Sequence, residues 1–73
     1  MRWLGQHIVD SDIYIEGDLV FTEKSSDPDN PEEGNSVLWM SDGTGTGDDG
    51  DILVKISAGG RTATKTLVDF SEV

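Results

Sequence analysis

The fold is decided by residues 36–57, which read SVLWMSDGTGTGDDGDILVKIS, two short apolar runs joined by a loop of glycine and aspartate. The first run, Val37–Met40, has four apolar residues between turn formers, too few for a helical stripe and typical of a buried strand. In the second run Ile52, Val54 and Ile56 recur at every other position, which places them on one face of a strand. The stretch therefore predicts two strands and a connecting loop.

The connecting loop is acidic and rich in glycine. Four glycines fall within Gly43–Gly50, a density that disfavours helix and permits positive φ angles, so we expect an irregular surface loop. Calcium prefers oxygen ligands, and the candidate metal ligands are the loop carboxylates Asp42, Asp48, Asp49 and Asp51. A solvated turn is the plainer interpretation, because an EF-hand counted from Asp42 has Leu53 where the bidentate glutamate is required.

A β-hairpin is predicted further along the chain. Gly59-Gly60 separates Ile52–Ser57 from Thr62–Val68, and two glycines between strands are typical of a two-residue turn. The turn places residues opposite one another in three pairs, Ile56 with Ala63, Val54 with Lys65, and Ile52 with Leu67. The pairing of Val54 with a lysine is unfavourable, which leaves a bulged register open.

The segment before the central stretch also alternates. From Val9 to Thr22 the odd positions are mainly apolar and the even positions mainly acidic. We predict two short strands, Asp12–Glu16 and Asp18–Thr22, with a kink or bulge at Gly17.

Residues 23–35 contain both prolines and show no periodicity, so they are predicted to form a loop. The chain then divides into an N-terminal β arm (1–22), an acidic proline-containing loop (23–35) and a C-terminal β unit with a hairpin (36–73), within a single small domain. All periodic segments are strands, so we predict an all-β class with no helix longer than a turn.

The size of the chain favours self-association. Seventy-three residues, of which 34% are hydrophobic, provide little apolar surface for an independent core, and no cysteine is present to form a disulfide. We therefore expect copies of the chain to share a core. Its predicted members are Ile13, Ile15, Leu19, Phe21, Val37, Trp39, Ile52, Val54, Ile56, Leu67 and Phe70. For Trp39 this packing role is favoured over display of an exposed aromatic ring.

Composition also argues against several kinds of function. A net charge of −10 is unsuited to nucleic acid or an anionic membrane as partner, and the apolar runs are too short to span a bilayer. No signal peptide is visible, which suits assembly inside a cell. His7 is the single histidine and has no nucleophile and acid arranged with it, so we expect no enzyme and no cofactor beyond a calcium ion.

Two parts of the chain resemble structural proteins of tailed bacteriophages. Asp12–Phe21, DIYIEGDLVF, is similar to the Gly-Asp-Leu segments of tail fibres, and Pro28–Phe70 resembles such proteins in PEEG (31–34), SVLWMSDGTG (36–45), GDDGDILVKI (47–56) and LVDFS (67–71). The resemblance implies an intertwined homotrimer of β-prism or β-helix type, a virion location after assembly in the host cytoplasm, and other virion proteins as partners. It implies no active site. The chain is short and non-repetitive, so it matches a connector or cap and not a fibre shaft.

The sequence therefore predicts a non-enzymatic structural or oligomerisation module of a phage virion or tail-fibre-like assembly. The alternative is a small calcium- or glycan-binding β-domain that uses the Asp42–Asp51 loop and Trp39.

Overall fold

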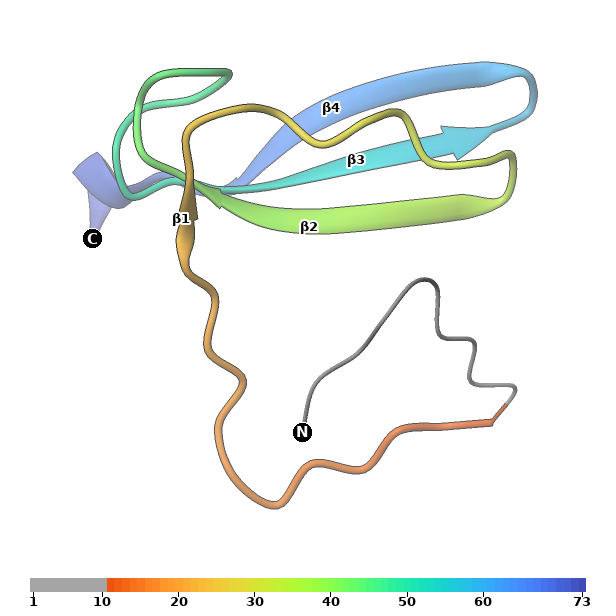
Figure 1. Cartoon of the computed structure of the whole chain (residues 1–73), viewed down its shortest axis with the longest axis horizontal. Coiled ribbons are helices and arrows are strands. Elements are labelled where there is room, and N and C mark those ends of the chain that lie inside the picture. Colours follow the sequence, from red (N-terminus) through yellow and green to blue (C-terminus); the bar gives the residue numbers. More distant parts are fainter. Residues whose placement is uncertain (1–10) are drawn as a thin grey trace.

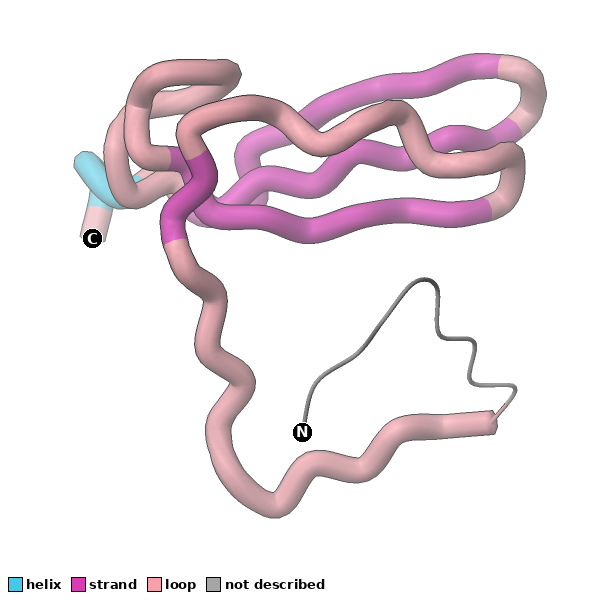
Figure 2. The backbone as a smooth tube through the Cα atoms, in the orientation of Figure 1, coloured by secondary structure: helices cyan, strands magenta, loops and turns pink. Residues whose placement is uncertain are grey.

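The computed structural model describes residues 11–73, which contain one four-stranded sheet in the order β1-β2-β3-β4 (Figure 1). The elements are β1 (Glu23–Lys24), β2 (Asn35–Ser41), β3 (Ile52–Ala58), β4 (Arg61–Val68) and a single turn of 3-10 helix, η1 (Phe70–Glu72). The predicted all-β class is confirmed, and no α-helix occurs between residues 11 and 73 (Figure 2).

The hairpin between β3 and β4 forms at the predicted glycines. Gly59 and Gly60 have φ angles of 62° and 75°, a left-handed pair that fits a two-residue turn between twisted strands. The predicted pairs of Ile56 with Ala63 and of Val54 with Lys65 are confirmed. The third predicted pair is wrong, because a register shift places Val68 opposite Ile52 and leaves Leu67 as the extra residue of a bulge.

The first half of the chain differs from the prediction. Neither Asp12–Glu16 nor Asp18–Thr22 is a strand, and residues 11–22, here called the arm, leave the sheet as an extended segment (Figure 1). Alternation gives the arm the pattern of a strand, but a strand also needs a partner, and no strand among residues 11–73 pairs with the arm; β1, which follows it, pairs with the Met40–Ser41 end of β2. The predicted loop 23–35 accordingly begins with this short parallel strand, which pairs with Met40 and Ser41.

One face of the sheet is covered by the chain itself. Its buried residues are Trp39, Ser41, Leu53, Lys55 and Ser57. Residues 25–34, here called the covering segment, run along this side of β2 and β3 (Figure 1). The small core of the chain therefore lies between the sheet and a loop.

The opposite face of the sheet contains the alternating apolar residues of β3. Ile52, Val54 and Ile56 do share a face, as predicted, and their partners Leu38 and Met40 on β2 extend it. Nothing among residues 11–73 buries this face: Ile56 is 46% exposed and Ile52 and Val54 are half-buried. The covering segment lies on the Leu53 side, so within one chain the alternate residues of β3 are the buried ones.

Candidate functional site

The uncovered side of the sheet is the candidate interaction surface. We call it the apolar face, and its large members are Leu38, Met40, Ile52, Val54, Ile56 and Val68. Leu38 is 44% exposed and Val68 is 41% exposed, so apolar atoms meet water across three strands. Contiguous apolar surface of this kind marks binding sites more often than free protein surface.

The β4 side of the apolar face is basic. Ladder pairing places Arg61 and Lys65 on this face, next to Ala58 and Val54. A shallow hollow of about 130 Å³ lies here, lined by Ile56, Ala58, Arg61 and Ala63. β4 has two basic residues and no acidic one, in a chain that carries five bases and fifteen acids.

The covered face owes its order to polar contacts that sequence patterns did not identify. The buried Lys55 ammonium donates to the carbonyl of Pro28 at 2.7 Å and lies 5.8 Å from the centroid of the Trp39 ring. A buried charge is costly unless it is paired or hydrogen-bonded, and these contacts offset that cost. The alternation of β3 gave no sign of this role, because it placed the lysine among the polar, solvent-facing positions.

Glu33 fastens the end of the covering segment to the hairpin. Its carboxylate accepts hydrogen bonds from the backbone N–H groups of Gly59 and Gly60 at 2.6 and 3.1 Å. Next to it, the Gly34 N–H donates to the Ser57 carbonyl at 2.7 Å. The segment is therefore tied to the sheet by both side-chain and backbone bonds.

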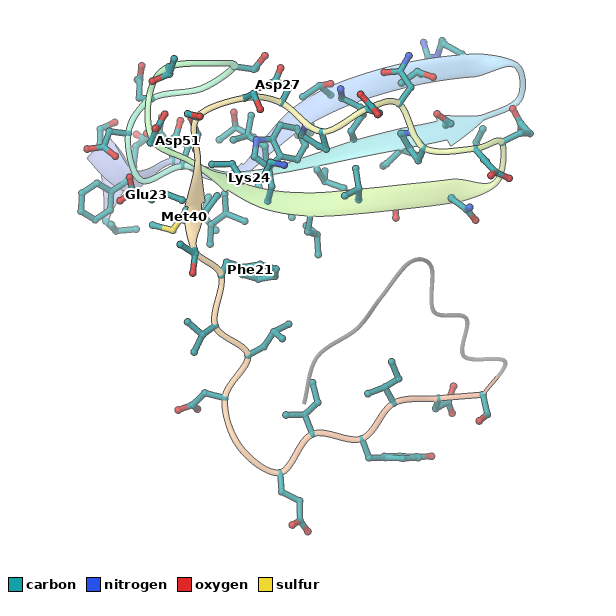
Figure 3. The ribbon with its side chains drawn as sticks, in the orientation of Figure 1. Phe21, Glu23, Lys24, Asp27, Met40 and Asp51 are labelled. Carbon is teal, nitrogen blue, oxygen red and sulfur yellow. The ribbon has the colours of Figure 1, made fainter. Side chains whose placement is uncertain are left out.

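Asp27 fastens the other end to the glycine-rich loop. Its carboxylate accepts a bond from the Thr46 backbone N–H at 2.9 Å and another from the Thr46 hydroxyl. These hydrogen bonds, with a smaller contribution from the positive charge of Lys55, hold the pKa of Asp27 below its ordinary value of 3.8. Figure 3 shows Asp27 on the covering segment and Asp51 at the end of the loop, at the same end of the sheet as β1.

Asp51 organises the interior of the acidic loop. It is 4% exposed, and its two carboxylate oxygens accept from the backbone N–H groups of Asp48 and Phe70, each at 3.0 Å. The Ser41 N–H donates to the Asp51 carbonyl at 2.8 Å. Asp51 thus joins the loop to β2 and to the C-terminal turn, which makes it a structural acceptor.

The other predicted metal ligands are dispersed. Asp42 accepts from the Thr44 N–H at 2.9 Å within its own turn. A hydrogen bond that the protonated Glu23 carboxyl donates to Asp49, together with the negative charge of Asp49, raises the pKa of Glu23 above its ordinary 4.5. Between residues 11 and 73 no group of three or more histidine or acidic side chains is arranged to hold a metal ion. Calcium binding by Asp42, Asp48, Asp49 and Asp51 stays a prediction.

The predicted core residues fall into three sets within one chain. Trp39 is buried at 3% exposure, so its packing role is confirmed and its ring is not displayed to a ligand. The strand residues Val37, Ile52, Val54 and Ile56 are half-buried or exposed. The outer set is Ile13, Ile15, Leu19, Leu67 and Phe70, all more than half exposed, with Phe21 half-buried.

None of the helical structure in the described residues is long and apolar enough to cross a membrane. No protein-family model, curated protein or solved structure matches this chain.

Proposed function

We propose that this chain is a non-enzymatic structural module that works as a homo-oligomer and associates through the apolar face. The single observation that carries the proposal is the position of Leu38 and Ile56, which lie on the central strands β2 and β3 but are exposed to solvent. A surface strand normally has polar residues on its outer side. Apolar residues on both sides of β3 indicate that each side is meant to be covered.

The distribution of apolar side chains supports this proposal. Among residues 11–73 two hydrophobic side chains are buried, Trp39 and Leu53, whereas eleven large ones are exposed. Burial of apolar surface is the main favourable contribution to folding, so a core of this size leaves an isolated chain marginal. Association would bury the exposed set and add the missing stability.

The place of the module in a larger particle is proposed from the phage resemblance. On that basis it is part of a virion or tail-fibre-like assembly, forms a trimer, contacts other virion proteins and is assembled in the host cytoplasm. The charge of −10 argues against nucleic acid and membrane as partners. The calcium- or glycan-binding alternative gains nothing from the geometry, since Asp51 is engaged by backbone and Trp39 is buried.

Sedimentation equilibrium on the wild-type chain and two variants tests the proposal. Ile56→Asp places a charge on the apolar face, and Thr64→Asp is the matched control on the opposite face of the adjacent strand. We expect the wild type and Thr64→Asp to give the same oligomeric mass and Ile56→Asp to shift to the monomer. A wild type that is monomeric at every concentration, or an Ile56→Asp mass equal to that of the wild type, contradicts the proposal.

A further inference from the structure

Within residues 11–73, most of the arm lies against no other part of the fold. Residues 11–20 are all exposed, with Ile13 at 69%, Ile15 at 54% and Leu19 at 64%. The arm departs from the sheet at β1 and does not return to the apolar face (Figure 1). An extended segment with apolar residues on alternate positions can bury them against a flat apolar surface.

We infer that the arm of one copy lies across the apolar face of a second copy. This inference rests on the proposed self-association and names the segment that covers the face. The arm presents Ile13, Ile15 and Leu19 at odd positions. β-period geometry directs Ile13 and Ile15 to a single side, and Leu19 follows the bend at Glu16-Gly17. The apolar face presents aliphatic side chains of similar size from three adjacent strands.

Charge complementarity favours this occupant over a second copy of the same face. The described arm carries Asp12, Glu16 and Asp18 and no basic residue. The β4 side of the apolar face carries Arg61 and Lys65 and no acidic residue. Two apolar faces packed on each other would add a second pair of cations to the same contact, whereas the arm brings a segment of opposite net charge to it.

A cysteine scan over the full chain tests the arrangement, since the natural sequence has no cysteine to interfere. One chain carries Ile56→Cys, and a second chain carries a single cysteine in the arm, either at an odd position (Ile13→Cys, Ile15→Cys) or at an even one (Asp12→Cys, Tyr14→Cys). The two chains are mixed, equilibrated with oxidised and reduced glutathione, and analysed by mass spectrometry. A disulfide needs Cβ atoms about 4 Å apart, so the reaction reports direct apposition.

We expect the odd positions to form the mixed disulfide at least about tenfold more than the even ones, because only one side of the arm meets the face. Replacing Ile56→Cys by Thr64→Cys, on the opposite face, should abolish this preference. Arg61→Glu with Lys65→Glu should reduce the disulfide yield, and Lys24→Glu, a charge reversal on β1, should leave it unchanged.

Three results overturn the inference. Equal yields from odd and even positions, or equal yields at Ile56 and Thr64, show that the arm does not lie on the apolar face. Failure to cross-link in a chain that sediments as an oligomer overturns the arm contact and leaves the proposed function standing. A wild-type chain that sediments as a monomer overturns both.

Discussion

The two faces of the sheet are built from the same strands and differ in what secures them. The covered face is partly polar, with Lys55 and Ser57 buried beside Trp39 and Leu53, and a loop is fastened over it by specific hydrogen bonds. The apolar face has the more hydrophobic residues and remains open. Hydrophobicity alone therefore did not determine which side is buried within one chain.

The difference shows how the chain assigns its two surfaces. Polar contacts such as the Lys55 bond to Pro28 have direction, so they select the side on which the covering segment lies. Apolar burial has no direction, and it leaves the other face available to any complementary surface. The covered face therefore holds the fold of one chain, and under the proposed function the apolar face is the surface that joins chains together.

The largest expected effect on the covered face comes from Trp39→Ala. Removing a buried aromatic ring should lower the free energy of unfolding by about 3–5 kcal/mol, from lost transfer energy and the cavity left behind. Urea denaturation followed by circular dichroism measures the change. Val68→Ala, an exposed truncation on the apolar face, is the matched comparison, and a similar loss at both positions would contradict the distinction between the faces.

A smaller effect is expected at Asp51. Asp51→Asn retains one carbonyl acceptor and loses the other, so one of two backbone N–H groups, that of Asp48 or that of Phe70, is left unsatisfied. The expected cost is about 1–3 kcal/mol in the free energy of unfolding. Asp48→Asn is the control, because its exposed side chain makes no such bond in the described structure. Calcium should not raise the melting temperature of wild type if Asp51 is structural, and a calcium-dependent rise would support the predicted ion site.

A substitution in the hairpin turn should lower the free energy of unfolding by an amount similar to that of Asp51→Asn, and from a single cause. Gly60→Ala meets no atom within 4 Å, so its cost comes from the positive φ of 75° alone, about 1–2 kcal/mol. Denaturation again gives the value. Gly17→Ala is the control, because Gly17 has no positive φ and no atom lies within 4 Å of the added Cβ. This substitution should be neutral or slightly stabilising. Equal losses of stability at Gly17 and Gly60 would argue against the two-residue turn.

The smallest expected effects depend on pH. The pKa of Asp27 is lowered, so the stability it adds is present above its ordinary value of 3.8 and is lost as pH falls through the lower folded value. The pKa of Glu23 is raised, so its contribution is present below 4.5 and is lost as pH rises through the higher folded value. Asp27→Asn should therefore be less stable than wild type at neutral pH and converge with it in acid. The stability of Glu23→Gln relative to wild type should increase as pH rises. Melting curves from pH 2 to 7 would show this trend for Glu23→Gln and the opposite trend for Asp27→Asn.

Local signals in the sequence were sufficient to predict the strands on either side of the acidic loop and the turn at Gly59-Gly60. In both cases the information lies in residues close together in the chain, where alternation and paired glycines act directly on the backbone. The unfavourable pairing of Val54 with Lys65 indicated a bulge, but a single pair does not locate the extra residue, which is Leu67.

Features that depend on distant partners could not be predicted. The path of the covering segment depends on Glu33 reaching the hairpin and on Lys55 reaching Pro28, and neither contact leaves a periodic trace in the sequence. The arm has the alternation of a strand, but alternation does not say whether a partner lies in the same chain. The sequence likewise does not distinguish a structural aspartate from a metal ligand, because a carboxylate can accept hydrogen bonds from backbone N–H groups or bind an ion.

The most direct test of association through the apolar face is an isotope-filtered NMR experiment on a mixture of ¹³C-labelled and unlabelled chains. It detects methyl groups of one copy that lie within about 5 Å of protons in another. If the apolar face joins the chains, intermolecular signals should appear at the methyls of Ile52, Val54 and Ile56 and not at those of Leu53. Intermolecular signals confined to Leu53, or none from the apolar face in a sample that is folded at millimolar concentration, would contradict it.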